Sequence, residues 1–134
     1  MKQFQLKIVT PDGLRYDGAA EELVVRTVSG DMGILAGHIN CVAPLGMGRA
    51  TLIVDGKRSY GACIGGMVTV MAGNVNVVAT AFEWADQIDA ARARASELRA
   101  REALAQKERS SQDILLAQAR LKRALVRQSV VGQK

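Results

Sequence analysis

The sequence predicts a β-sandwich or barrel followed by a C-terminal α-helical hairpin. Up to residue 84, short apolar segments alternate with polar residues and are separated by Gly-containing turns, at the roughly 8–12-residue spacing of sandwiches and barrels. After residue 84 the chain changes to Ala, Arg, Leu, Gln and Glu, and its apolar residues recur at the three- and four-residue steps of a helix. We therefore expect a β-sandwich domain over residues 1–84 and a two-helix hairpin over residues 85–134.

The first 45 residues contain two strand signals, each followed by a turn signal. Gln3–Val9 alternates as a strand does, and Thr10–Gly13 reads Thr-Pro-Asp-Gly, in which Pro fixes one dihedral angle and Gly supplies a positive one. Glu21–Val28 predicts another strand, which Ser29–Gly33 closes. Ile34–Leu45 is apolar but contains Gly and Pro, so we expect a long loop that crosses between sheets.

Two β-hairpins are expected in the second half of the sandwich. The turn sequences Asp55–Lys57 and Ala72–Asn74 each contain a Gly in the position that a tight hairpin turn favours. The strands that flank these turns are predicted over Arg49–Val54, Arg58–Cys63, Met67–Met71 and Val75–Thr80.

The helical half begins near Asp86. Asp86–Arg109 lacks both Gly and Pro and predicts a first helix, and Ser110–Asp113 has the form of a capping box at the start of a second helix that ends near Gly132. A seam of alanines would hold the two helices closely but weakly, because each buried methyl group contributes only about 0.8 kcal/mol. Tight permanent packing of small residues is the alternative. The positions expected on the inner faces are Ile88, Ala91, Ala95 and Leu98, followed by Ile114, Ala117, Leu121 and Ala124.

The predicted hairpin carries the whole net charge of +5. Residues 85–134 hold eleven basic and six acidic side chains, and no acid follows Asp113. We expect this basic end to face an acidic protein surface or a polyphosphate, and a solvated helix face is the alternative. A β-sandwich adaptor whose basic helices bind nucleic acid is a second alternative, although the second helix has no aromatic residue to stack on bases. The basic run consists of Arg120, Lys122, Arg123 and Arg127.

Other classes of function find little support in the sequence. His38, Cys41 and Cys63 lie at unrelated positions, so they assemble neither a nucleophile with its base nor a metal site. We therefore expect no catalytic residue, no metal and no required cofactor, and we expect both thiols to be reduced. No apolar run reaches the ~18 residues that cross a bilayer, which favours a soluble, cytoplasmic chain without direct membrane insertion.

Several motifs resemble the family of epsilon subunits of bacterial F-type ATP synthases, over essentially the whole chain. The most specific is the Gly-Ile-Leu-x-Gly-His core at residues 33–38. The chain departs from the usual family pattern at Ala36 and Asn40, where many members carry Pro. The other matching segments are Val9–Gly13 with Tyr16, Ser29–Met32 before the core, and Gly65–Gly66 at the start of a strand.

The resemblance implies a β-sandwich of about ten strands followed by a two-helix regulatory hairpin. It also implies a non-catalytic subunit of the central stalk, a peripheral protein on the cytoplasmic face of the bacterial membrane. It implies that the sandwich contacts the gamma subunit and the c-ring, with Gly33, Gly37 and His38 at a subunit interface, and helps to couple proton flow to ATP synthesis. The C-terminal helices are expected to extend along gamma toward an acidic segment of the beta subunits, with alpha as an alternative contact, and to inhibit ATP hydrolysis. Arg120, Lys122, Arg123 and Arg127 would supply the docking charge.

Some members of this family bind ATP in the folded hairpin, so the resemblance also implies ATP as a regulatory ligand. Their motif matches Ile88–Ala93, and further positions thought to line the site match Glu83, Arg99, Arg123 and Arg127. Asp89 and Arg92 stand three apart, so we expect them to share a helix face. Their side chains would then accept from the adenine amino group and approach a phosphate, respectively. An ordinary surface ion pair is the alternative.

Overall fold

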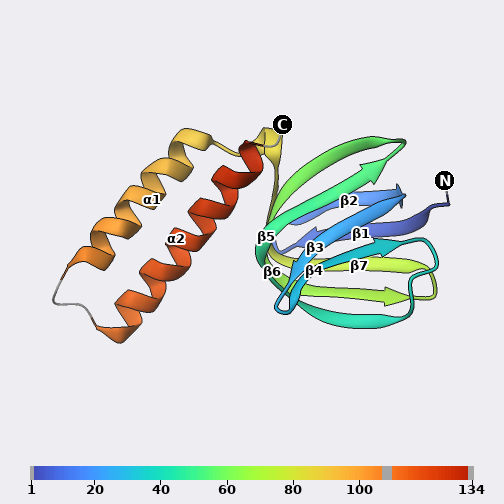
Figure 1. Ribbon diagram of the computed structural model, residues 1–134, viewed down its shortest axis with the longest axis horizontal. Helices are drawn as coiled ribbons and strands as arrows, with labels where there is room; N and C mark the ends of the chain where they lie inside the picture. The colour runs from blue at the N-terminus through green and yellow to red at the C-terminus, as the bar shows by residue number, and fades with distance from the viewer. Residues whose placement is uncertain (1, 107–109, 133–134) are drawn as a thin grey trace.

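The computed structural model describes residues 2–106 and 110–132, which form a β-sandwich followed by two antiparallel helices (Figure 1). The predicted fold class is confirmed. Helices α1 (Ala90–Ala105) and α2 (Ser111–Val131) follow a 3₁₀ turn at Ala85–Gln87. The strands in the described residues are β1 (Phe4–Thr10), β2 (Gly13–Ala20), β3 (Glu22–Thr27), β4 (Gly30–Leu35), β5 (Cys41–Val54), β6 (Lys57–Met71) and β7 (Asn74–Trp84).

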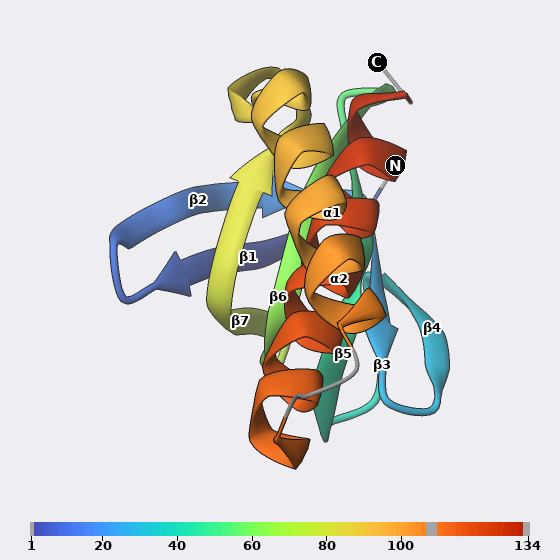
Figure 2. The same cartoon turned by 90° about the vertical axis from the view of Figure 1, so that its left-hand side faces the viewer.

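Hydrogen bonds join these strands into one sheet in the order β2-β1-β7-β6-β5-β3-β4. The pairing of β1 with β7 is parallel, and the other pairings are antiparallel. Strands β5 and β6 are long and curve, so the single sheet folds back on itself into two layers (Figures 1 and 2). Segments that glycines seem to separate in the sequence are therefore parts of single bent strands, so the described residues contain seven strands where about ten were expected. Gly66 is required near the bend, because a Cβ atom there would lie 2.0 Å from the Val78 carbonyl oxygen.

The two predicted hairpins between β5, β6 and β7 are confirmed. Asp55 and Gly56 have φ values of 51° and 75°, and Ala72 and Gly73 have φ values of 50° and 81°. Positive φ at both central residues is the signature of a type I′ turn, whose twist matches that of the flanking strands. The turn at Thr10–Gly13 also joins β1 to β2 as predicted.

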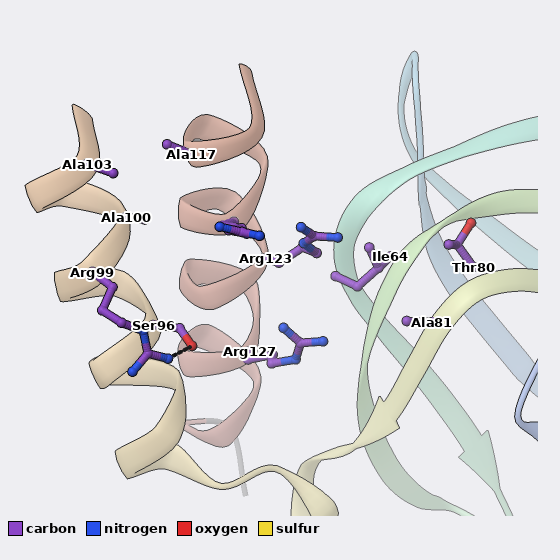
Figure 3. Close-up of a pocket in the computed structure, with 11 residues that line it drawn as sticks. Ile64, Thr80, Ala81, Ser96, Arg99, Ala100, Ala103, Ala117, Arg123 and Arg127 are labelled. Atoms are coloured by element: carbon purple, nitrogen blue, oxygen red, sulfur yellow. Dashed lines mark hydrogen bonds between the residues drawn. The ribbon is translucent and has the colours of Figure 1, made fainter. Parts of the chain in front are cut away.

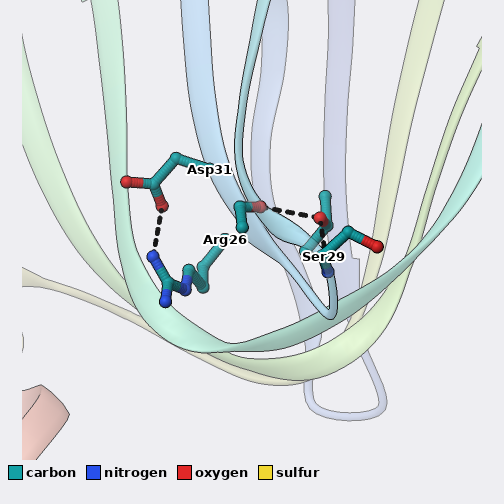
Figure 4. Close-up of polar contacts among 5 residues, drawn as sticks. Arg26, Ser29 and Asp31 are labelled. Carbon is teal, nitrogen blue, oxygen red and sulfur yellow. Dashed lines mark hydrogen bonds and ion pairs between the residues drawn. The ribbon is translucent and has the colours of Figure 1, made fainter.

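The long loop predicted over Ile34–Leu45 is wrong, because only residues 36–40 are irregular. The turn predicted at Ser29–Gly33 is likewise shorter, since β4 already begins at Gly30. The Thr27 hydroxyl closes this turn by donating to the Gly30 carbonyl oxygen at 2.6 Å and accepting from the Ser29 amide at 3.1 Å (Figure 4). Arg26 and Asp31 form an exposed ion pair across it, at 3.5 Å. The turn therefore depends on the hydrogen bonds of the Thr27 hydroxyl as well as on its glycines.

The sandwich core consists mainly of branched aliphatic side chains from both layers. Phe82 joins them near the end of β7, and its ring packs edge-on against Trp84 with a centroid distance of 4.8 Å. The indole Nε1 of Trp84 donates to the Arg15 carbonyl oxygen at 3.0 Å, which fixes the point where the chain leaves the sandwich. Side chains that are less than 2% exposed include Leu6, Ile8, Leu23, Val25, Ile34, Val68, Val70, Val75 and Val77.

The first helix begins four residues later than predicted. Asp89 is its N-cap, and the Asp89 carboxylate accepts from the Arg92 amide at 3.0 Å. The predicted helix end at Arg109 falls in residues 107–109, outside the described residues. At α2, the Ser110 hydroxyl accepts from the Asp113 amide at 3.1 Å, which confirms the hydroxyl half of the capping box.

The inner face predicted for α1 is wrong, whereas the inner alanines of α2 are confirmed. Ala93 and Ala100 are buried in place of Ala91 and Ala95, and Leu98 is 62% exposed. Alanines occur on every side of α1, so their spacing does not indicate which face of the helix is buried. On α2, Ala117 and Ala124 are buried and Leu121 is half-buried, but Ile114 is exposed. We call the buried alanines of the hairpin the alanine seam; they are Ala93, Ala100, Ala117 and Ala124.

The hairpin approaches the sandwich mainly through α2. This helix lies between α1 and the strands, and it contacts β5 and β6 (Figures 1 and 2). Val130, in its last turn, is fully buried. The opposite end of the hairpin, where α1 leads to α2, extends away from the sandwich (Figure 1).

Candidate functional site: arginine-lined cavities beside the second helix

A cavity of about 410 Å³ lies along α2, between the hairpin and strands β6 and β7 (Figure 3). Arg123 and Arg127 extend from α2 toward the strands, whereas Arg99 comes from α1 and donates to the Ser96 hydroxyl at 3.2 Å (Figure 3). Arg120 completes the set, and no carboxylate of the described residues lines this cavity. Four guanidinium groups therefore face one space, whose other lining residues are Ile64, Thr80, Ala81, Ser96, Ala100, Ala103 and Ala117.

A second cavity, of about 300 Å³, adjoins the first near the start of α1. The two cavities share Ser96 and Arg127 as lining residues. The charges of the second cavity balance, because it contains two carboxylates and two guanidinium groups. It is lined by Glu83, Gln87, Asp89, Arg92, Ala93, Ser96 and Arg127.

An ion pair between Glu83 and Arg127 stands where the two cavities meet. Arg127 Nε donates to Glu83 Oε1 at 2.5 Å, which ties α2 to the end of β7. Both side chains are about one-third exposed, so water screens the pair and its contribution is at most about 1 kcal/mol. The pair therefore orients the Arg127 side chain but contributes little to the free energy that attaches α2 to the sandwich.

Asp89 and Arg92 lie on the same side of the start of α1, where both line the second cavity. Asp89 precedes the helix as its cap, and the described residues show no ion pair between these two side chains. Ile88 lies just before the cap, is half-buried and lines neither cavity.

The structure also brings in site residues that the sequence did not single out. Ser96 lines both cavities, and Gln87 lines the second one. The Gln87 side chain accepts from the Trp84 amide at 3.2 Å, which helps to shape the wall between β7 and α1. For Ser96 a signal was available, because it is a small polar residue one turn from both Arg92 and Arg99 on a helix otherwise rich in Ala and Arg.

Three of the four predicted docking cations turn inward in this conformation. Arg120, Arg123 and Arg127 line the first cavity, and Lys122 is exposed on α2 and lines neither cavity. The predicted docking set and the predicted ATP-binding set therefore share a surface. A ligand in the first cavity and an acidic partner would use the same arginines.

The predicted interface residues belong to β4 and to the irregular segment that follows it, and this segment lies at the end of the sandwich opposite the hairpin (Figure 1). Gly33 is in the strand, and Gly37 and His38 are in the segment, which comprises residues 36–40. His38 Nδ1 lies 2.8 Å from the Ile39 carbonyl oxygen. We call the exposed apolar side chains here the apolar end; they are Leu35, Ile39, Val42 and Met71.

A side-chain hydrogen bond joins this irregular segment to the β6–β7 turn. The Asn40 side-chain oxygen accepts from the Ala72 amide at 2.9 Å. The departure from the family pattern at Asn40 thus supplies a tether between two loops of the apolar end.

The cysteines are free, and they do not form part of either cavity. Cys63 is buried, and this burial raises the pKa of its thiol to about 11, which keeps it protonated and unreactive at neutral pH. Cys41 Sγ lies 4.0 Å from His38 Nδ1. The described residues contain no group of three or more side chains suited to hold a metal ion.

Comparison with known proteins gives the class of protein that this fold and surface define. Residues 3–85 match the family model for the β-sandwich domain of the ATP synthase delta/epsilon chain, and residues 86–132 match the model for its long α-helix domain. The chain therefore belongs to the ATP synthase delta/epsilon chain family.

Similar sequences narrow this class to the epsilon type. The ATP synthase epsilon chain of Shouchella clausii is 41% identical over 134 residues, which span 100% of this chain and 98% of that protein. The ATP synthase epsilon chain of Bacillus licheniformis is 44% identical over 130 residues, or 97% and 98% of the two chains. The predicted resemblance to the epsilon subunit is confirmed. The chain is thus a non-catalytic subunit of an ATP synthase, a membrane-associated complex whose other subunits are its partners.

Solved structures share the same fold at low sequence identity. A chain in the Euglena gracilis mitochondrial ATP synthase OSCP/F1/c-ring structure has a TM-score of 0.79, with 22% identity and coverage of 90% of this chain and 76% of that one. A chain in the Tetrahymena thermophila central stalk/c-ring structure has a TM-score of 0.66, 14% identity and 97% coverage of both chains. The alternative of a nucleic-acid-binding adaptor is not supported. Neither helix in the described part of the chain is both long enough and apolar enough to span a bilayer.

Proposed function

We propose that this chain is a rotor subunit on the cytoplasmic face of a bacterial membrane, and that its hairpin is a mobile arm that inhibits ATP hydrolysis and senses ATP. The observation that carries the proposal is the convergence of Arg99, Arg120, Arg123 and Arg127 on one cavity, where Arg127 alone has a carboxylate partner among the described residues, Glu83. Four like charges repel one another unless an anion lies among them. The folded hairpin is therefore a state that a polyphosphate stabilises.

The two cavities divide the chemistry of ATP between them. The four guanidinium groups of the first cavity suit the triphosphate, because guanidinium groups form charge-assisted and bidentate hydrogen bonds with phosphate oxygens. The second cavity suits the adenosine, since its carboxylates and the Gln87 amide can accept hydrogen bonds from amino and hydroxyl groups. Both volumes are within the roughly 300–1,000 Å³ range of small-molecule sites. The shared residue Arg127 would then contact the ligand where the two parts of ATP join.

ATP would act on the arm by mass action. A ligand that binds only the folded hairpin stabilises it by about 2.7 kcal/mol at 100 times its dissociation constant. This is comparable with what an alanine seam supplies, at about 0.8 kcal/mol for each buried methyl group. High ATP concentrations would hold the arm down and permit hydrolysis, whereas low concentrations would release it.

The released arm would carry its arginines to an acidic partner. Arg120, Lys122, Arg123 and Arg127 are the charges we assign to docking against an acidic segment of the beta subunits, with alpha as the alternative. Long-range attraction is screened beyond about 8 Å at physiological salt, so extension along gamma would have to bring the arm close first. Occupation of the cavity by ATP and docking to beta would be mutually exclusive.

The apolar end would provide the contact with the c-ring. Exposed apolar side chains that form a contiguous patch mark interaction surfaces, and Ile39 is 77% exposed beside Gly37 and His38. The remaining surface of the sandwich would contact gamma, and the two contacts together would couple rotation driven by proton flow to ATP synthesis. Crosslinking from a cysteine introduced at Ile39 to the c-ring, in the assembled complex, tests this placement.

The ATP site is tested by calorimetric titration of the full chain with ATP. The decisive variants are Arg123→Ala, which removes a lining guanidinium, and Asp89→Asn with Arg92→Ala. Asparagine still caps the helix, so this double variant removes charge without removing the cap. Arg94→Ala is the matched control, because Arg94 is an exposed arginine of α1 that lines neither cavity. We expect binding by the native chain and by Arg94→Ala, and a loss of at least roughly tenfold in affinity in the other two.

Failure to bind ATP by the native chain would remove the sensing role. It would not affect the assignment to the family, which rests on the sequence comparisons. Inhibition is tested separately by hydrolysis assays of the assembled complex at low ATP concentration. There, Lys122→Ala should relieve inhibition without changing ATP binding, because Lys122 lines neither cavity.

A further inference from the structure

Two consecutive residues of α2, Arg127 and Gln128, form hydrogen bonds with two different elements of the structure. Arg127 donates to Glu83 at the end of β7, and Gln128 Nε2 donates to Glu97 Oε1 of α1 at 2.8 Å. Elsewhere along the hairpin, the buried side chains between the two helices are alanines. The last turns of α2 are therefore the place where polar contacts join sandwich, first helix and second helix.

Glu97 is well placed to define the position of α2. Its second oxygen, Oε2, accepts from Arg101 Nε at 2.7 Å within α1, so both carboxylate oxygens are engaged. The Glu97 side chain is only 21% exposed. A carboxylate whose two oxygens are both hydrogen-bonded is held in one orientation, so its hydrogen bond with Gln128 fixes the position of α2 relative to α1. Contacts between alanine methyl groups are non-directional and do not fix this position.

The buried end of α2 strengthens this arrangement. Val130 follows Gln128 by two residues and is fully buried, whereas Leu115 and Leu116 near the start of α2 are exposed. The attachment of α2 is thus concentrated at its C-terminal end. Because Arg127 and Gln128 are consecutive, a displacement of this turn of α2 would strain both contacts together.

We propose that Glu97–Gln128 and Glu83–Arg127 form one clasp, so that the two helices separate from each other and leave the sandwich in a single coupled step. The role of this clasp in regulation rests on the proposed function, in which the hairpin is the mobile arm. Glu97 and Gln128 line neither cavity, so they are positioning residues that act through the placement of α2. The clasp decides how readily the arm opens before any ligand or partner is present.

The test is amide hydrogen exchange of the full chain in the absence of nucleotide. Glu97→Ala should raise exchange roughly three- to tenfold, since it removes one interhelical hydrogen bond to a charged group that is partly screened. The same factor should apply to residues 90–100 of α1 and 117–131 of α2, because one opening event exposes both. The core strands of the sandwich should keep their protection. Glu102→Ala is the matched control, since Glu102 is an exposed glutamate of α1 with no part in the clasp.

A swapped pair sharpens the test. Gln128→Glu alone should open the arm further, because it places two carboxylates together, and Glu97→Gln combined with Gln128→Glu should restore much of the protection by reversing the pair. Faster exchange confined to one turn, no acceleration, or an equal effect of Glu102→Ala would overturn the clasp. Because no nucleotide is present, these outcomes are independent of ATP binding. If the exchange results reject the clasp while the native chain still binds ATP, only the clasp is wrong. If the clasp is supported but the native chain does not bind ATP, only the ATP site is wrong.

Discussion

The sandwich and the hairpin are held together by different amounts and kinds of contact. In the sandwich, fully buried Leu, Ile and Val side chains from both layers interlock, and a continuous hydrogen-bonded ladder joins all seven described strands. In the described part of the hairpin, the buried side chains are four alanines and Val130. A buried Leu or Val contributes about 1.5–3 kcal/mol, against about 0.8 kcal/mol for a methyl group. The chain thus joins a stable platform to a weakly attached arm.

This difference fits the two roles that we propose for the chain, which are the transmission of force and the response to a ligand. A platform that carries load between other subunits must not unfold when its arm moves. An arm that is held by a small free energy can be shifted by a ligand whose binding contributes a similar amount. Trp84 marks the border, because its indole hydrogen bond and its packing on Phe82 belong to the platform while the chain after it enters the arm.

The largest effect is expected from damage to the platform. Leu23→Ala should lower the free energy of unfolding by about 2–5 kcal/mol, because Leu23 is fully buried and its removal leaves a cavity. Urea denaturation followed by circular dichroism measures this change. Leu98→Ala is the control, since Leu98 is 62% exposed on the arm and its loss should change stability by no more than about 0.5 kcal/mol. Similar effects of the two changes would contradict the division into platform and arm.

An intermediate effect is expected from overfilling the alanine seam. Ala124→Leu should oppose closure of the hairpin by about 1–3 kcal/mol, because Ala124 is 1% exposed and a larger side chain forces the helices apart. The urea midpoint of the sandwich should stay nearly constant while proteolysis within the hairpin accelerates. Ala91→Leu places the same side chain on an exposed position of α1 and should do neither. If the Ala124→Leu variant is not cleaved faster than the native chain, the helices are not closely packed.

Much of the platform was predictable from sequence because its signals are local. The turns at Asp55–Lys57 and Ala72–Asn74 require positive φ values, and their chemistry is visible in the residues themselves. The bent strands β5 and β6 were not predictable in this way. Pro44 and Gly65 suggest breaks, but pairing on both sides carries the strands through them.

The arm was less predictable because its apolar residues are mostly alanines and do not mark one helix face. With alanines on every side of α1, periodicity could not distinguish Ala93 and Ala100 from Ala91 and Ala95. Asp86 and Asp89 are both residues that favour an N-cap, so local chemistry alone did not decide between them. The arginines of the cavity came from the family resemblance and the basic run, whereas Ser96, Gln87 and the pair of Glu97 with Gln128 emerged only when distant segments were placed side by side.

The smallest effect expected is a dependence of arm closure on pH. The hydrogen bond from Gln128, followed by the contacts with Arg101, holds the pKa of Glu97 below the ordinary glutamate value of 4.5. The closed arm therefore favours the ionised carboxylate, and this contribution is complete above pH 4.5. It is lost as the pH falls below that value and Glu97 takes up a proton. Amide exchange in α2, corrected for the intrinsic chemical rate, should reveal extra opening of the native chain in acid.

Glu97→Gln separates this effect from general acid destabilisation. It keeps a side-chain oxygen that can accept from Gln128 but has no proton to gain, so its arm should lack the component of opening that titrates below pH 4.5. Other carboxylates, such as Glu83 beside Arg127, remain in both proteins, and their contributions therefore cancel in the comparison. Identical pH profiles for the two proteins would mean that Glu97 keeps the same pKa whether the arm is closed or open. The attachment of the arm would then reside in its buried alanines, in Val130 and in the pair of Arg127 with Glu83.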